Sequence, residues 1–261
     1  MKKYITDFTV VGRRVYGDAY FAMELEHPGE LPEIEAGQFV EVEVKGSREV
    51  MLRRPISVHD VDREHNRLTL LVQVVGNGTR RLSQIGEGER VSLVYPLGKG
   101  FLHGIGFVPQ RPLLVGGGAG VAPLLYLSRC LTAQGASPTL LLGGRTAGLI
   151  ASRERFEAVE GAHVHYSTED GSLGEKGLVT QHSVFGKDYD AILCCGPTPM
   201  MRAVAREAVR RGVPCEVSLE NRMACGVGAC LCCVTETREG HKCVCKEGPV
   251  FTPQTLGWDN E

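Results

Sequence analysis

The stretch Pro112-Leu-Leu-Val-Gly-Gly-Gly-Ala-Gly-Val-Ala-Pro123 decides the fold expected for the centre of this chain. Its apolar start predicts a buried strand, and its glycines predict a tight turn into a helix that continues through Cys130. Backbone N–H groups at such a turn can face a diphosphate, because glycine has no side chain to block the approach. Pro123 suits the first helical turn. The residues expected to bind a nucleotide are Gly116, Gly117, Gly118, Gly120 and Pro123; a turn without a ligand is the alternative.

Short apolar strands alternate with helical stretches after this turn, which predicts a parallel sheet with helices on both faces. The expected strands lie near 139–142, 163–166, 190–194 and 215–219, and the expected helices near 153–159, 179–183 and 200–211. One strand ends in Cys194-Cys-Gly-Pro197, at the edge of the sheet where ligands bind. We expect Cys194 in the core and Cys195, Gly196 and Pro197 beside the ligand. The alternative is that both cysteines are buried in the core.

Residues 1 to about 100 alternate apolar and polar positions in short stretches, such as 40–44 and 90–94, which predicts a small closed antiparallel barrel. Within it, Arg53-Arg-Pro-Ile-Ser57 predicts a proline-fixed bend, with a guanidinium suited to phosphate and a hydroxyl suited to a ring heteroatom. Solvent-exposed arginines are the alternative. Gly76-Asn-Gly-Thr79 is either a simple turn or a second phosphate cradle.

Four cysteines near the end of the chain have the spacing C-x4-C-x2-C followed by a more distant fourth: Cys225, Cys230, Cys233 and Cys245. Plant-type [2Fe–2S] centres have this ligand pattern, in which four thiolates hold two irons. Gly226 and Gly228 allow the backbone to fold tightly around a small inorganic core. A structural zinc site that uses Cys243 with Cys245 is the alternative, although zinc usually joins two well-separated C-x2-C pairs.

The composition excludes several classes of function. With 23% charged residues and a net charge of −2, the chain gives no reason to expect nucleic acid or an anionic membrane as a partner. No apolar run approaches the length of a membrane span. Ten cysteines, with no apolar leader segment before them, predict reduced thiols and a cytoplasmic protein.

Together these stretches resemble the ferredoxin–NADP reductase superfamily, with a flavin-binding barrel followed by a nicotinamide-binding α/β domain. The resemblance rests on 54–57, 78–79, 116–123 and 195–197. It implies an FAD-binding β-barrel over 1–102, an NAD-binding α/β domain over 103–219 and a small [2Fe–2S] domain over 220–261. The residues that it implies for FAD are Arg54, Pro55, Ile56, Ser57, Leu71, Val72, Gln73, Gly78 and Thr79.

The cysteine-rich tail narrows the resemblance to electron-transfer subunits of NAD-linked dihydroorotate dehydrogenases. It is carried by Leu52-Arg-Arg-Pro-Ile-Ser, Pro96-Leu-Gly-Lys-Gly-Phe, Met223-Ala-Cys-Gly-Val-Gly-Ala-Cys and Val244-Cys-Lys-Glu-Gly-Pro-Val-Phe. The resemblance implies that an FMN-containing catalytic subunit oxidises dihydroorotate in pyrimidine biosynthesis. Electrons then pass through the [2Fe–2S] centre and FAD of this chain to NAD+, within a heterotetramer of two catalytic and two electron-transfer chains.

Two other functions remain open from the sequence alone. A flavin subunit of another NAD(P)-linked complex, of the ferredoxin:NADP, sulfide or hydrogenase type, shares the barrel, the nucleotide domain and a similar cysteine loop. The second alternative is a non-enzymatic interaction module that is stabilised by a structural zinc ion. For the nucleotide, Glu169 and Asp170 follow a strand and favour NAD by repelling a 2′-phosphate, whereas Arg145 and Arg153 favour NADP; we expect NAD.

Overall fold

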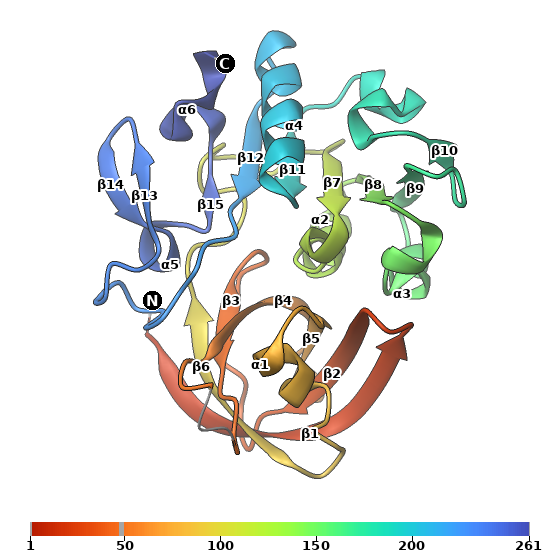
Figure 1. Cartoon of the computed structure of the whole chain (residues 1–261). Coiled ribbons are helices and arrows are strands. Elements are labelled where there is room, and N and C mark those ends of the chain that lie inside the picture. Colours follow the sequence, from red (N-terminus) through yellow and green to blue (C-terminus); the bar gives the residue numbers. More distant parts are fainter. Residues whose placement is uncertain (1, 47–49, 261) are drawn as a thin grey trace.

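The computed structural model describes residues 2–46 and 50–260 and contains a closed barrel, a mixed sheet and a C-terminal segment (Figure 1). The barrel lies at the bottom of the view, in red to yellow, and the sheet lies above it. The C-terminal segment, in blue, lies beside the end of the sheet formed by β12. No helix in the described part of the chain is both long and apolar enough to cross a bilayer.

The barrel has the strand order β1-β2-β5-β4-β3-β6, and each neighbouring pair is antiparallel. Alternate side chains of its strands fill one buried cluster, which includes Phe8, Val40 and Leu68. The predicted antiparallel barrel is therefore confirmed. Its strands are β1 (Tyr4–Tyr16), β2 (Tyr20–Glu26), β3 (Phe39–Val42), β4 (Arg54–Asp62), β5 (Arg67–Gln73) and β6 (Arg90–Leu97), and helix α1 (Asn77–Leu82) lies between the last two.

The second sheet has the order β10-β9-β8-β7-β11-β12-β15, and only its last strand is antiparallel to its neighbour. Its strands are β7 (Leu113–Gly117), β8 (Thr139–Gly144), β9 (His163–Thr168), β10 (Glu175–Lys176), β11 (Ile192–Cys195), β12 (Cys215–Ser218) and β15 (Val250–Phe251). The α-helices between them are α2 (Leu124–Ala133), α3 (Arg153–Glu157) and α4 (Thr198–Arg210). The 3₁₀ turns are η1 (Gly118–Val121), η2 (Ala147–Leu149), η3 (Val179–Gln181) and η4 (Ser183–Gly186).

Successive residues of the central strands supply two separate cores, as expected for a sheet that is covered on both faces. Leu113 and Val115 pack with α4 on one face, whereas Leu114 packs with α2 and α3 on the other. The helix expected over 179–183 is instead the two 3₁₀ turns η3 and η4. Such short segments have too few residues to sustain an α-helix, and the tighter turn is common in connections.

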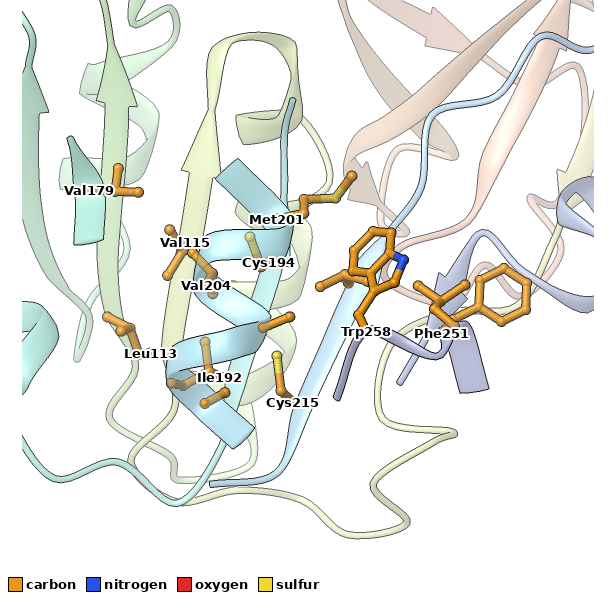
Figure 2. Close-up of a cluster of buried hydrophobic side chains, with 14 of the residues drawn as sticks. Leu113, Val115, Val179, Ile192, Cys194, Met201, Val204, Cys215, Phe251 and Trp258 are labelled. Carbon is orange, nitrogen blue, oxygen red and sulfur yellow. The ribbon is translucent and has the colours of Figure 1, made fainter. Parts of the chain in front are cut away.

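The C-terminal segment has more regular structure than its sequence suggests. It contains β13 (Val234–Thr237), β14 (Gly240–Cys243), α5 (Val244–Glu247), α6 (Pro253–Leu256) and η5 (Trp258–Asn260), in addition to β15. Figure 2 shows Trp258 between Met201 of α4 and Phe251 of β15. The segment therefore packs into the core of the sheet and is held in place by that packing.

Glu216 joins the barrel to the sheet through the connection between them. Its carboxylate lies on β12, is fully buried and accepts hydrogen bonds from three backbone N–H groups of the connecting chain. The donors are Leu102 at 2.6 Å, Gly104 at 2.5 Å and Ile105 at 3.3 Å. The acceptor is on a strand of the sheet, and the donors are in the chain that leaves the barrel. These hydrogen bonds therefore fix the position of the barrel relative to the sheet.

His59, on β4, joins the same two parts at a second place. Its ring is fully buried, and Nδ1 lies 2.7 Å from the carbonyl of Ala122 while Nε2 lies 2.9 Å from Oγ of Ser152. A neutral ring satisfies both contacts, with Nδ1–H donating to the carbonyl and Nε2 accepting from the hydroxyl. Burial is the largest cause that lowers the pKa of His59, from 6.5 to about 4.

This depressed pKa predicts that the protein loses stability on mild acidification. The unfolded chain takes up a proton near pH 6.5 but the folded protein only near pH 4, so the stabilisation is complete above 6.5 and is lost as the pH falls towards 4. The loss is on the order of 3 kcal/mol. The free energy of unfolding, measured with urea at pH 7.5 and 4.5, should show this loss for the wild type. The exposed-site control His241→Gln should show the same loss, whereas His59→Gln should not. Equal losses in all three proteins would show that His59 is not responsible.

Candidate cofactor sites

A cavity of about 330 Å³, here named the barrel cavity, opens between the barrel and the sheet. Its walls come from β4, β5 and α1 of the barrel and from the ends of β11 and β12. It brings together most of the residues predicted to hold FAD, together with one predicted to meet the nicotinamide: Arg54, Pro55, Ile56, Ser57, Leu71, Gln73, Thr79 and Cys195.

The barrel cavity forms where β4 and β5 separate. Strand β4 pairs with β5 from Val58 onward, whereas its first residues, 54–57, pair only with β3. Proline is tolerated in a strand that has one unpaired side, which explains Pro55. The stretch is therefore a strand rather than the proline-fixed bend that the sequence suggested, and its open side faces the cavity.

Arg54 lies against the first turn of α1. A Cβ atom at Gly78 would overlap the Arg54 guanidinium, so glycine is required for this side chain to take its place at the cavity wall. Arg54 also donates to the carbonyl of Leu52 at 2.7 Å. The Thr79 hydroxyl accepts from the N–H of Val75 at 2.9 Å and shapes the loop before the helix. The stretch 76–79 is thus a helix start that positions Arg54, not a simple turn.

Strand β5 presents alternate residues to the barrel cavity. Leu71 and Gln73 line it, whereas the side chain of Val72 is buried in the barrel core. Strand periodicity sends the side chain of Val72 away from the cavity, so a contact of this residue with FAD stays a prediction for its backbone alone.

A second cavity of about 440 Å³, here named the sheet cavity, lies over the carboxyl ends of β7, β8 and β9. Gly117, Gly118 and Pro197 line it, as the nucleotide prediction requires. Arg145 and Glu169, which the sequence analysis weighed against each other for NADP and NAD, both lie on its wall. Gln73 lines both cavities, so the two sites meet at the end of β5.

The four glycines of the 116–120 turn have different roles. A Cβ atom at Gly116 would lie 2.8 Å from Cδ1 of Leu124, and one at Gly117 would lie 2.5 Å from Sδ of Met200. At Gly120 it would overlap the carbonyl of Cys195. Packing therefore favours glycine at Gly116 and requires it at Gly120, whereas the contact at Gly117 is with the flexible end of Met200. Their role toward a nucleotide stays a prediction. At Gly118, with φ +57°, the only atom of the described residues near a Cβ position is the Tyr20 hydroxyl at 3.8 Å, an ordinary contact distance, so this is the glycine that leaves room for a ligand.

The structure also separates the two cysteines at the end of β11. Cys194 is buried in the core, and Cys195 lies on the wall of the barrel cavity, as predicted. Burial and then the nearby carboxylate of Glu220 raise the pKa of Cys195 to about 12, so its thiol stays protonated. Gly196 passes so close to Met200 that a Cβ atom there would lie 2.5 Å from its methyl group. Pro123 caps the start of α2, and its role toward a ligand stays a prediction.

The four predicted cluster ligands form two pairs. The backbone N–H of Cys230 donates to Sγ of Cys225 at 3.4 Å, and the backbone N–H of Cys245 donates to Sγ of Cys233 at 3.4 Å. Two thiolates for each of two irons is the arrangement that a [2Fe–2S] centre needs. In the described part of the chain, no three His, Cys, Asp or Glu side chains converge closely enough to hold a single metal ion. Two pairs of thiols therefore suit a dinuclear centre better than one zinc ion.

Backbone N–H groups surround the cysteine sulfurs. Sγ of Cys225 accepts from Val227 at 3.4 Å, Ala229 at 3.3 Å and Cys230 at 3.4 Å, and Gly228 donates to Sγ of Cys245 at 3.1 Å. Burial acts to raise the pKa of Cys225, but these hydrogen bonds outweigh it and lower the pKa to about 6. Positive φ angles at Gly226 (65°) and Gly228 (83°) bend the loop so that its N–H groups converge. The loop thus favours the thiolate, the form that binds iron, at Cys225, whereas burial raises the pKa of Cys245 to about 12.

The cysteine loop and the barrel cavity are adjacent. Asn221 and Met223 line the cavity and lie just before Cys225 in the chain. The side-chain amide of Asn221 also donates to the carbonyl of Cys233 at 3.2 Å. One short segment therefore forms a wall of the predicted flavin site and binds the predicted cluster loop.

Sequence reasoning missed several residues that line these cavities. Tyr20 lies in the sheet cavity, Glu220, Asn221 and Met223 lie in the barrel cavity, and Met200 lies beside the glycine turn. The run from 220 to 223 immediately precedes the first cysteine ligand, and this adjacency was the signal that could have identified it. Tyr20 carries no comparable signal, because it is an ordinary aromatic residue at the start of a strand.

Comparisons with known proteins agree with this geometry. Residues 220–257 match the family model for the iron–sulfur cluster binding domain of dihydroorotate dehydrogenase B, and 114–206 match the oxidoreductase NAD-binding domain. The chain is 40% identical to the dihydroorotate dehydrogenase B (NAD(+)) electron transfer subunit of Caldanaerobacter subterraneus subsp. tengcongensis, over 92% of each chain. It is 42% identical to that of Bacillus cereus, over 83% of this chain and 85% of the relative.

Solved structures show the same fold. A chain of an NADH-dependent reduced ferredoxin–NADP oxidoreductase, a structure determined to study flavin-based electron bifurcation, superposes with a TM-score of 0.84. It is 30% identical, over 97% of this chain and 90% of that one. The ferredoxin reductase of carbazole 1,9a-dioxygenase shares the fold with a TM-score of 0.70 at 21% identity, over 82% of this chain and 68% of that chain.

The predicted fold class and cofactors are thereby confirmed: the chain is an oxidoreductase subunit that uses FAD, a [2Fe–2S] centre and NAD. Relatives of 37–42% identity match 83–96% of its length, and residues 220–257, which contain the cysteine loop, match an iron–sulfur cluster binding domain. The chain belongs to the family of electron-transfer subunits of NAD+-linked dihydroorotate dehydrogenase B.

Proposed function

We propose that this chain carries electrons from an FMN-containing dihydroorotate dehydrogenase to NAD+ through the sites described above. Cys225, Cys230, Cys233 and Cys245 hold the [2Fe–2S] centre, the barrel cavity holds the flavin of FAD, and the sheet cavity holds NAD. When bound, the [2Fe–2S] centre supplies one-electron transfer and FAD combines two single electrons into a hydride for NAD+.

One observation supports this proposal above the others: the three sites are contiguous. Asn221 connects the cysteine loop to the barrel cavity, and Gln73 belongs to both cavities. Cys195 and Pro197 lie at the same junction, from the strand end that faces both sites. Electrons that enter at the cysteine loop therefore have a short path through one flavin to the nicotinamide.

The chain's own residues hold and orient the bound groups. Arg54, fixed between α1 and the carbonyl of Leu52, binds the FAD phosphates, and Ser57 accepts or donates at the flavin ring. The open turn at Gly118 presents its backbone to the dinucleotide. The protonated Cys195 thiol packs beside the nicotinamide, where it excludes water without acting as a nucleophile.

The outer side of the cysteine loop is the proposed docking site for the catalytic subunit. Cys230 is exposed, and the neighbouring apolar side chains Leu231 and Val227 are 64% and 39% exposed. An apolar surface beside a redox centre suits a protein partner, which must approach closely to pass an electron. We propose a heterotetramer of two catalytic and two electron-transfer chains, located in the cytoplasm, where the ten free thiols of this chain stay reduced.

Reconstitution of the two-subunit pathway tests the proposal. The isolated holoprotein should oxidise NADH with an artificial acceptor but leave dihydroorotate unchanged. Adding the FMN-containing catalytic subunit should allow dihydroorotate to reduce NAD+, followed as NADH absorbance. Dihydroorotate turnover by the isolated chain would contradict a two-subunit pathway. NADH oxidation that couples to a ferredoxin but never to the catalytic subunit would instead support the ferredoxin:NADP type of complex.

A further inference from the structure

Tyr20 occupies an unusual position at the junction of the two proposed cofactor sites. It begins β2, lies opposite Gln73 in the register with β5, and is 2% exposed. Its ring packs between the barrel and the sheet, in a cluster with Leu71 and Val121. Tyr20 is nevertheless a lining residue of the sheet cavity, so its polar end faces that space.

The hydroxyl of Tyr20 has no protein partner. Within residues 2–46 and 50–260, no group forms a hydrogen bond with it. Buried tyrosine hydroxyls usually have a hydrogen-bond partner, because burial without one is costly. The side chain of Tyr20 is buried, while its hydroxyl opens onto the sheet cavity without a partner among the described residues, so the hydroxyl is placed to meet a ligand there.

The surroundings of the hydroxyl identify the ligand group. It lies 3.8 Å from the position that a Cβ atom would take on Gly118, the one glycine of the turn whose Cβ position has no closer contact in the described chain. The carboxylate of Glu220 and the guanidinium of Arg145 lie close enough to influence it electrostatically. Burial, followed by Glu220, raises the pKa of Tyr20 to about 12, so the hydroxyl remains an uncharged donor. An uncharged donor beside an open glycine turn suits an anionic oxygen.

We infer that Tyr20, a barrel residue, is a positioning residue for the nicotinamide nucleotide and donates a hydrogen bond to its diphosphate. The inference rests on the proposed function, in which NAD occupies the sheet cavity. It adds that the nucleotide site is completed by the flavin-binding barrel, so that the dinucleotide is bound with its nicotinamide end directed toward the flavin. The packing of barrel on sheet therefore contributes directly to nucleotide affinity.

The variant Tyr20→Phe tests this inference because it removes only the hydroxyl. Isothermal titration calorimetry of the FAD-loaded protein should show an affinity for NAD+ lowered by about 3- to 10-fold, the effect expected for one lost hydrogen bond. The KM for NADH should rise by a similar factor while kcat with an artificial acceptor and the FAD content stay unchanged. ADP-ribose, which keeps the diphosphate but lacks nicotinamide, should lose affinity by the same factor as NAD+.

Tyr16→Phe is the matched control. Tyr16 lies opposite Tyr20 in the register of β1 with β2, but its hydroxyl donates to Glu154 at 2.8 Å and does not line the sheet cavity. Its affinity for NAD+ should equal that of the wild type. The inference is overturned if Tyr20→Phe binds NAD+ as tightly as wild type, if Tyr16→Phe weakens binding equally, or if ADP-ribose is unaffected. Failure of the proposed function is distinguishable, because the wild type itself would then bind no NAD+.

Discussion

Cys230→Ser is expected to lose the [2Fe–2S] centre and to abolish electron transfer from the catalytic subunit. Serine keeps the size of the side chain but is a poor ligand for iron compared with a thiolate, so one of the two iron positions loses half of its protein ligands. Iron content per chain and the visible spectrum of anaerobically purified protein should fall to background. Dihydroorotate-dependent NADH formation should fall with them, whereas NADH oxidation with an artificial acceptor should persist.

Cys232→Ser provides the control for this variant. Both cysteines are exposed and lie in the same loop, but only Cys230 is within the ligand pattern and paired with Cys225. The control should keep wild-type iron content and wild-type turnover with the catalytic subunit. If Cys230→Ser also keeps both, the assignment of the ligands is wrong.

Arg54→Ala is expected to lose most of its FAD. The guanidinium lies at the wall of the barrel cavity, held between Gly78 and the carbonyl of Leu52, and no other arginine lines that cavity in the described part of the chain. Each charge-assisted hydrogen bond to phosphate contributes about 1.5–3 kcal/mol, so FAD affinity should fall by about 10- to 100-fold. Flavin absorbance per protein after gel filtration measures the loss, and added FAD should restore NADH oxidation.

Arg80→Ala is the corresponding control, because Arg80 is an exposed arginine on the same helix, outside the barrel cavity. It removes the same charge from nearly the same place and should retain FAD as the wild type does. Flavin occupancy that is unchanged in Arg54→Ala would refute the role of this arginine. If the two variants lose equal amounts of FAD, the cause is the change in net charge and not a contact between Arg54 and a bound phosphate.

The sequence was most informative where local pattern alone determines the outcome. Strand alternation separated Cys194 from Cys195, and the predicted ligand spacing corresponds to two neighbouring pairs of cysteines in the structure. Strand periodicity also separates Leu71 and Gln73, which line the barrel cavity, from Val72, whose side chain is in the barrel core.

The features that the sequence did not predict concern contacts between distant segments. Gly120 is required by the backbone of Cys195, which lies on another strand, and the sequence gives no indication of that approach. The strand at 54–57 was mistaken for a bend because its unpaired side depends on where β5 diverges. Tyr20 was missed for the same reason, since its role follows from the way the barrel packs on the sheet.

The measurement that tests the central claim most directly is low-temperature electron paramagnetic resonance of the anaerobic holoprotein reduced with NADH. If FAD and the [2Fe–2S] centre form one path through this chain, electrons from NADH must cross the flavin and reach the iron. The spectrum should then show the unpaired electron of a reduced [2Fe–2S] centre, and this signal should be missing from Cys230→Ser. Bleaching of the flavin without any iron signal in the wild type would contradict the account.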